Sequence, residues 1–176
     1  MGTPDAFTLK KILFSQINNL PLNPNVMTEK EEEKTEELCY YRLNLMSLLK
    51  SSYPEYLDDE DFISSRAQEA ARVFEDAVRN GSNYLDASAE ANRTLYRGLG
   101  FSKFDMVFTV LTEEFAKELK EEEFRPFALK MMSVCEDVFA RYELHEDFED
   151  SPEYDVLYTE ITGRIVTYIE NNGIDL

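Results

Sequence analysis

The chain has 176 residues and is strongly acidic, because 36 Asp and Glu oppose 18 Lys and Arg and leave a net charge of −18 at pH 7. This charge argues against direct nucleic-acid binding, since neutralisation of phosphates supplies most of the affinity in such proteins. One domain is the usual content of a chain of this length, and 43% hydrophobic residues suffice for its core, while 6 Gly and 6 Pro are too few for a turn-rich β-protein.

Residues 1–34 differ from the rest and are predicted to form a separate N-terminal arm. Apolar side chains from Phe7 to Ile17 are spaced for one short helix, and the prolines of Leu20–Asn25 end it. The charged run 29–34 is expected to be solvated. The N-terminus lacks the pattern of a signal peptide, and no apolar run reaches the roughly 20 residues of a membrane span, so a cytoplasmic location without membrane contact is expected.

The second predicted unit, residues 35–176, contains the apolar helical stripes of a multihelical domain. Apolar residues from Leu38 to Leu49 recur at spacings of three and four and predict a first helix that ends before Pro54. Carboxylates at 58–61 favour the start of a second helix, which is expected to end at Asn80–Gly81.

Four further helices follow along the chain. A third is predicted over about 85–97, and Ser102 with Asp105 resembles the capping box of a fourth. A long fifth helix is predicted from about Glu122 to Tyr142. Ser151-Pro152-Glu153 predicts the N-cap and first turn of the last helix. With no convincing strand, the fold class is all-α: a single-domain bundle of six main helices with a short N-terminal helix in addition.

Groups that support catalysis or metal binding are scarce. His145 is the single histidine, which cannot supply the paired Glu-x-x-His motifs of a helical di-metal site. The acidic stretch 146–155 lacks the central glycine and final glutamate of a calcium loop. Cys39 and Cys135 lie on predicted core faces and are expected to be buried thiols. No cofactor is expected, and an enzymatic activity is disfavoured.

Several short motifs carry a resemblance to a known family. They are Phe62-Ile63 with Arg66-Ala67, Gly98-Leu99 with Phe101-Ser102 and Asp105, Glu114-Phe115, Asp147-Phe148, Ser151-Pro152-Glu153-Tyr154 and Leu157-Tyr158-Thr159-Glu160-Ile161-Thr162-Gly163. Over about residues 38–174 the chain resembles an uncharacterised all-helical domain of unknown function from Bacteroidetes, often encoded near mobile genetic elements. The resemblance implies a compact helical domain and implies no activity.

The resemblance draws attention to polar residues of the last helix that lie off its apolar stripe. These residues could contact the preceding loop or a partner protein, and both interpretations stay open. The candidate interaction or structural residues are Asp147, Phe148, Glu153, Tyr158, Thr159 and Glu160.

Three functions remain open from the sequence. The favoured hypothesis is a non-catalytic protein-interaction or accessory factor with an unidentified protein partner, acting as a monomer or homodimer. The first alternative is an acidic mimic of nucleic acid that occupies a DNA-binding protein, which the excess of carboxylates motivates. The second alternative is a cryptic enzyme or a small-ligand binder, which would need a concave pocket.

Overall fold

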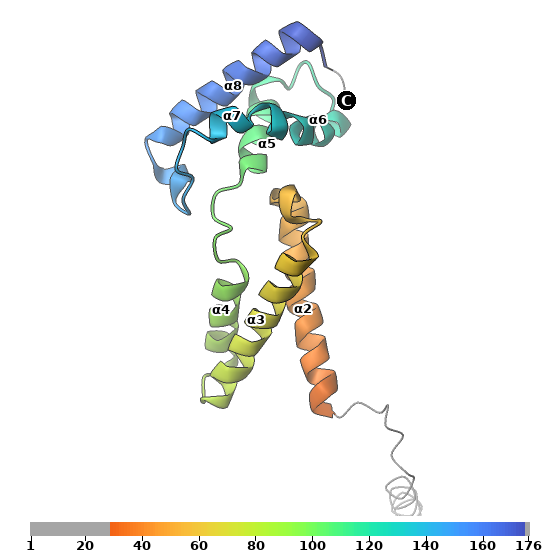
Figure 1. Cartoon of the computed structure of the whole chain (residues 1–176), viewed down its shortest axis with the longest axis vertical. Helices are drawn as coiled ribbons and strands as arrows, with labels where there is room; N and C mark the ends of the chain where they lie inside the picture. The colour runs from red at the N-terminus through yellow and green to blue at the C-terminus, as the bar shows by residue number, and fades with distance from the viewer. Residues whose placement is uncertain (1–28, 175–176) are drawn as a thin grey trace, which may run out of the picture. The chain divides into compact units, whose positions relative to one another are not determined.

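A computed structural model describes the backbone of residues 29–174 and the side chains from Leu38 onward, and Glu36–Leu176 form one compact unit. Within the described residues there are helices and no strand, which confirms the predicted all-α class. The predicted helix between Phe7 and Ile17 lies outside the described residues. The helices are α2 (Glu29–Ser52), α3 (Glu60–Arg79), α4 (Tyr84–Leu95), α5 (Lys103–Glu114), α6 (Glu121–Val134), α7 (Glu136–Phe139) and α8 (Glu153–Asn172) (Figure 1).

Six of these helices have two or more turns and correspond to the six main helices of the prediction, whereas α7 has only four residues. Two short 3₁₀ helices, η1 (Pro54–Tyr56) and η2 (Phe148–Asp150), lie in the connections before α3 and α8. None of the helices in the described range is long and apolar enough to cross a lipid bilayer.

One core cluster is built from α2, α3 and α4. Helices α3 and α4 run side by side (Figure 1), and their facing sides are dominated by alanine, which lets the two backbones approach closely. Helix α2 adds Tyr41, Leu45 and Leu49, which are spaced four residues apart and therefore lie on one face. The cluster also contains Tyr53, Ile63, Ala67, Ala70, Ala71, Phe74, Ala77, Ala87, Ala91 and Leu95.

A second core cluster is built from α5 to α8 and is rich in phenylalanine. Phe104, Phe127, Phe139 and Phe148 are its largest fully buried side chains. Helix α8 closes the cluster with Leu157, Ile161 and Ile165, again at spacings of four.

Side-chain caps fix the N-termini of three helices. Asp59 accepts a hydrogen bond from the backbone N–H of Phe62 at 2.8 Å, so part of the acidic run 58–61 serves as the predicted cap. Ser102 accepts from the N–H of Asp105 at 2.9 Å, which confirms its expected capping role. Asn83 caps α4 in the same way.

Hydrogen bonds also join the segment that links α4 to α5 to the end of α2 and to Tyr53 just after it. The hydroxyl of Tyr53 donates to the carbonyl oxygens of Leu99 and Gly100, at 2.7 and 2.9 Å. The hydroxyl of Ser102 donates to the carbonyl oxygen of Ser52, the last residue of α2. These hydrogen bonds hold the linking segment against the end of α2, and a turn bond from the Leu99 N–H to the carbonyl oxygen of Tyr96 lies within it.

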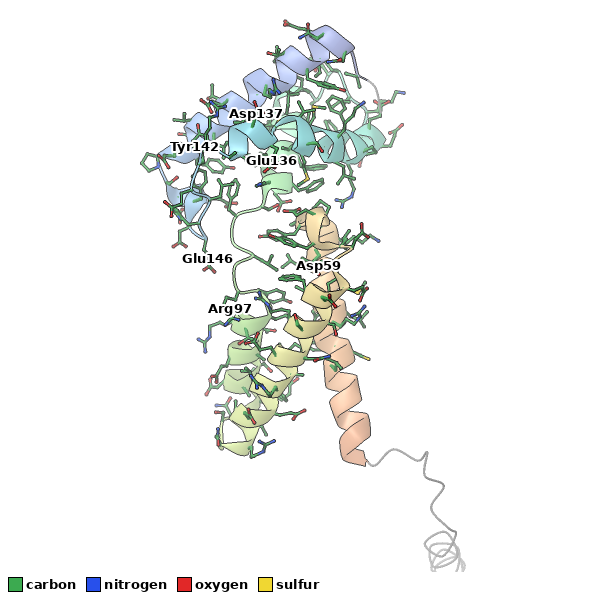
Figure 2. All side chains as sticks on the ribbon, viewed as in Figure 1. Asp59, Arg97, Glu136, Asp137, Tyr142 and Glu146 are labelled. Carbon is green, nitrogen blue, oxygen red and sulfur yellow. The ribbon has the colours of Figure 1, made fainter. Side chains whose placement is uncertain are left out.

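The loop before α8 approaches this linking segment closely. A Cβ atom placed on Gly100 would lie 2.5 Å from the Cα of Glu146, which Figure 2 labels at the tip of that loop. Such a distance is far shorter than any van der Waals contact, so position 100 requires glycine for steric reasons.

The prediction that Cys39 is a buried thiol is wrong, because its side chain is exposed. Cys39 precedes the buried Tyr41 by two residues, which is about 200° around a helix with 3.6 residues per turn. The apolar stripe of α2 therefore faces away from Cys39, whereas Cys135 is buried as predicted.

Three predicted helix boundaries also change. Helix α2 begins at Glu29 rather than near Thr35, because Glu and Lys are good helix formers and extend it through the charged run. The predicted boundary between the N-terminal arm and the helical domain, after residue 34, thus falls inside α2. The division of the chain into these two parts remains a prediction. Within the part of the chain that the structure describes, the hydroxyl of Ser151 makes no hydrogen bond, and Pro152 takes the N-cap position of α8 instead.

The predicted long fifth helix is interrupted at Cys135, where the backbone leaves helical geometry between α6 and α7. The side chain of Arg164 donates from Nε to the carbonyl oxygen of Val134, at 3.0 Å, and so satisfies an acceptor at the end of α6. The apolar periodicity of the sequence continues across Cys135, because Val138 and Phe139 of α7 are buried in the same core cluster as the apolar residues of α6.

Candidate functional site

The six candidate residues from the sequence lie in the loop between α7 and α8 and in the first two turns of α8. Phe148 differs from the other five, because its side chain is fully buried in the second core cluster. Its ring contacts Phe101, Tyr142 and His145 edge to face, with centroids 5.1 to 6.0 Å apart. Phe148 therefore anchors the loop to the core and is not accessible to a partner.

Glu160 connects α8 to the segment that follows α7. Its carboxylate accepts a hydrogen bond from the hydroxyl of Tyr142 at 2.9 Å and pairs with Arg141 at 3.2 Å. Tyr142 in turn contacts Phe148, so the polar and aromatic contacts form one chain from α8 to the loop. Burial and the hydrogen bond to Glu160 raise the pKa of Tyr142 above its ordinary value.

Tyr158 connects α8 to the C-terminal end of α5. Its hydroxyl lies 2.9 Å from Oε2 of Glu113 and 3.0 Å from Oε1 of Glu114. Burial and these two hydrogen bonds raise the pKa of Tyr158, so the phenol keeps its proton far above neutral pH. One phenolic proton serves two carboxylates, which leaves the pair with more acceptors than donors.

Within residues 38–174, three candidate residues make no hydrogen bond or ion pair to another helix. Thr159 donates to the backbone carbonyl oxygen of Asp155 one turn earlier, and its side chain is exposed. Asp147 and Glu153 are exposed at the start of η2 and of α8 respectively. The structure thus brings Tyr158 and Glu160 into contacts between segments and leaves Asp147, Glu153 and Thr159 at the surface.

Carboxylates from α5, the loop and α8 gather near the first turns of α8. Burial and then the charges of Glu149, Glu113 and Asp155 raise the pKa of Tyr154. Glu113 also binds Tyr158, so the acids of three separate segments converge here. Tyr158 is therefore a neutral hydrogen-bond donor in a negative environment.

The environment of Cys135 does not favour a nucleophilic thiolate. Burial raises the pKa of Cys135 to about 12, so this thiol stays protonated and is enclosed by the second core cluster. Among the described residues, no three His, Cys, Asp or Glu side chains are arranged to hold a metal ion.

A group of exposed apolar side chains lies on the first core cluster, and we call it the α2–α4 apolar surface. It comprises Tyr40 and Leu43 of α2, 57% and 66% exposed, and Tyr84 and Leu85 of α4, 70% and 78% exposed. Ring contacts link Tyr40 to Tyr84 through two buried rings of the core: Tyr40 to Tyr41 at 5.4 Å, Tyr41 to Phe74 at 6.5 Å, and Phe74 to Tyr84 at 5.4 Å. The exposed rings therefore continue outward from the core.

Sequence reasoning did not identify the partners in these contacts. Glu113 and Glu114 are 45 and 44 residues from Tyr158, and Arg141 is 19 residues from Glu160. Such distant polar pairs leave no periodic signal in one sequence. Tyr40 and Leu43 could have been noticed in the sequence, because they are apolar residues on the otherwise polar side of α2. Apolar patterns alone do not show which side of a helix is buried by the rest of the domain.

The chain is similar to a known family of domains and to a solved structure. Residues 32–174 match the model of a domain of unknown function, DUF1896. The crystal structure of protein PG0816 from Porphyromonas gingivalis is similar, with a TM-score of 0.77 and 38% sequence identity over 82% of this chain and 99% of that chain. A search of curated proteins found no match. The chain belongs to the DUF1896 family, and its expected relationship to an all-helical family of Bacteroidetes is confirmed.

Proposed function

We propose that this domain is a non-catalytic protein-interaction or accessory factor that docks a partner on the α2–α4 apolar surface. The observation that carries the proposal is the exposure of Tyr40, Leu43, Tyr84 and Leu85 on two helices that contribute to one core cluster. Exposed apolar side chains, particularly aromatic ones, often supply the binding energy of an interface. The proposed site of action is the cytoplasm, as expected from the sequence.

The partner is proposed to be a different protein with a positive surface. Two copies of this chain would each carry 18 excess negative charges, and their repulsion opposes self-association. A basic protein would instead be attracted before contact, and its apolar side chains could then pack on Tyr40 and Tyr84.

The second candidate function is the acidic mimic of nucleic acid. The gathering of Glu113, Glu149 and Asp155 around Tyr154 supports it, since a mimic needs several carboxylates on one part of its surface. In that case the carboxylates would supply the affinity, and the α2–α4 apolar surface would not be required.

Affinity purification with paired variants separates the two candidates. The tagged full chain would be used as bait in a lysate of the native host, beside a Leu43→Lys, Leu85→Lys double variant and a Val156→Lys, Val166→Lys control. Val156 and Val166 are 52% and 38% exposed on α8, so both double variants add the same charge at exposed positions. Bound proteins would be identified by mass spectrometry.

We expect to identify a basic protein that binds both the wild type and the α8 control. The α2–α4 variant should no longer bind it. A partner that binds both variants equally weakly would support the mimic, because the added positive charge is the only change that the two variants share. Size-exclusion chromatography with light scattering adds a further check. A dimer that dissociates in the α2–α4 variant would show that a second copy, rather than a basic protein, covers this surface.

A further inference from the structure

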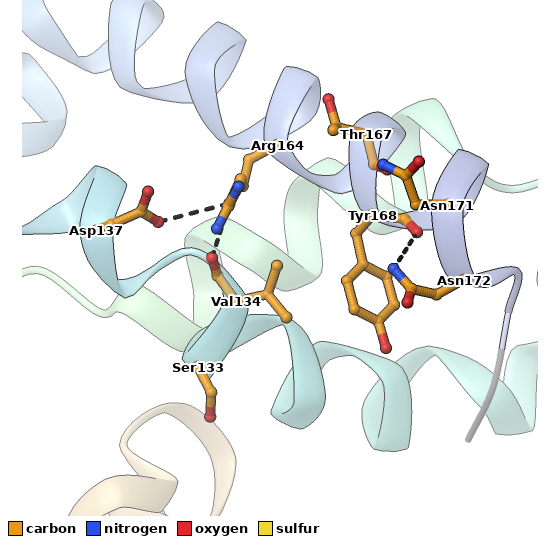
Figure 3. Close-up of a pocket in the computed structure, with 8 residues that line it drawn as sticks. All are labelled: Ser133, Val134, Asp137, Arg164, Thr167, Tyr168, Asn171 and Asn172. Atoms are coloured by element: carbon orange, nitrogen blue, oxygen red, sulfur yellow. Dashed lines mark hydrogen bonds and ion pairs between the residues drawn. The ribbon is translucent and has the colours of Figure 1, made fainter.

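A pocket of about 530 Å³ lies between α8 and the segment where α6 gives way to α7. This volume falls within the range of small-molecule sites, roughly 300 to 1,000 Å³. Figure 3 shows its lining residues, none of which belongs to the contacts described for Tyr158 or Glu160. The side chains that matter here are Val134, Asp137, Arg164, Tyr168, Asn171 and Asn172.

One face of α8 supplies most of the pocket's chemistry. Arg164, Tyr168 and Asn171 are separated by four and three residues and therefore lie on the same side of the helix. At 1.5 Å per residue, the distance along the axis from Arg164 to Asn171 is about 10 Å. The pocket is therefore elongated, with a guanidinium near one end, amides near the other and the Tyr168 ring between them.

The hydrogen-bonding capacity of Arg164 is only partly used. Its Nε atom donates to the carbonyl oxygen of Val134 and lies 3.5 Å from the carboxylate of Asp137. Across residues 38–174, no hydrogen bond engages the two terminal nitrogens of Arg164. A planar guanidinium with free terminal N–H groups is suited to a carboxylate, which can accept two parallel hydrogen bonds.

The middle and far end of the pocket differ from the Arg164 end. The ring of Tyr168 and the side chain of Val134 provide apolar surface, and Nζ of Lys130 lies 5.8 Å from the centre of the Tyr168 ring. Asn171 and Asn172 each donate one amide N–H to a backbone carbonyl one turn earlier. Each amide keeps a carbonyl oxygen and a second N–H for a ligand.

We propose that this pocket binds a small organic acid whose carboxylate contacts the terminal nitrogens of Arg164. Its apolar portion lies against Tyr168 and Val134, and a polar group at its other end reaches Asn171 or Asn172. The site is separate from the α2–α4 apolar surface, so this inference does not depend on the proposed function.

An NMR titration of the ¹⁵N-labelled full chain tests the proposal, with acetate, 3-phenylpropanoate and inorganic phosphate as probes at constant ionic strength. We expect 3-phenylpropanoate to shift the Arg164 Nε–H signal and the Asn171 and Asn172 amide signals. It should bind about tenfold tighter than acetate, because its ring removes apolar surface of the pocket from water. Absence of shifts at Arg164 would overturn the proposal, as would phosphate binding at least as tight as 3-phenylpropanoate.

Variants then identify the residues responsible. Arg164→Gln should weaken 3-phenylpropanoate binding about tenfold or more, since it removes a charge-assisted hydrogen bond. Arg141→Gln is the matched control, because Arg141 is also an exposed arginine that pairs with a carboxylate, and its loss should leave binding unchanged. Equal weakening by both variants would overturn the proposal, because attraction to any positive charge would then explain the binding.

Arg164 also supports the end of α6, so Arg164→Gln could act through the fold. The Asn171→Ala, Asn172→Ala double variant avoids this difficulty, because both side chains are exposed in the last turn of α8. Shifts at Arg164 should persist in this variant, with weaker binding of an acid that carries a distal amide, such as succinamate. Unchanged succinamate affinity would overturn the assignment of the amide end.

Discussion

The hydroxyl of Tyr53 binds two consecutive carbonyl oxygens, those of Leu99 and Gly100, in the segment between α4 and α5. Tyr53→Phe keeps the ring and removes both hydrogen bonds. We expect a loss of about 1–2 kcal/mol in the free energy of unfolding, measured by urea denaturation at pH 7. Tyr56→Phe is the control, because the Tyr56 ring stacks on Phe62 and its hydroxyl makes no hydrogen bond to a residue in the described range.

The same residue predicts a pH dependence. Burial, followed by the charges of Asp105 and Glu55, raises the pKa of Tyr53 from 10.0 to about 12. The unfolded chain therefore releases this proton first, and the stabilising contribution is lost as the pH rises from about 10 to 12. The difference in unfolding free energy between wild type and Tyr53→Phe should narrow over this window. If this difference in unfolding free energy stayed constant or grew between about pH 10 and 12, the raised pKa of Tyr53 would be contradicted.

Two glycines test packing at the level of the secondary-structure elements. Gly100→Ala would place a Cβ 2.5 Å from the Cα of Glu146, so we expect destabilisation of about 1–3 kcal/mol as the loop is displaced. Gly163 lies inside α8 with nothing within 4 Å of an added Cβ. Gly163→Ala should therefore stabilise by about 0.5–1 kcal/mol, because alanine is the better helix former. Thermal unfolding of the two variants measures both effects, and a shift of the same sign in both would refute the steric argument.

Elements with one apolar stripe and clear end signals could be predicted from the sequence. Asp59 and Ser102 cap their helices because these signals act over three residues. The interruption at Cys135 could not be predicted, since it involves Arg164, 29 residues later, and the apolar spacing continues across it. The pocket and the Tyr158 contacts share this property, because each joins segments that are far apart in sequence.

The charge of the whole chain predicts how its stability responds to salt. With 36 carboxylates and 18 basic groups, one-to-one pairing leaves at least 36 − 18 = 18 carboxylates without a partner. Their mutual repulsion destabilises the folded state and is screened by salt. The Tm should therefore rise when NaCl increases from about 10 to 500 mM, where the Debye length falls well below 10 Å. A Tm that fell over this range would mean that the ion pairs outweigh the repulsion, and equimolar KCl serves as the control for ion-specific effects.

Each core cluster comes from one uninterrupted stretch of chain: the first from Tyr41 to Leu95, the second from Phe104 to Ile165. During synthesis, every buried side chain of the first cluster is therefore made before any of the second and leaves the ribosome ahead of it. Contacts between near neighbours in sequence close small loops and form quickly. The nascent chain can thus bury its first apolar surface early, and the carbonyl oxygens that Tyr53 binds are the next to emerge.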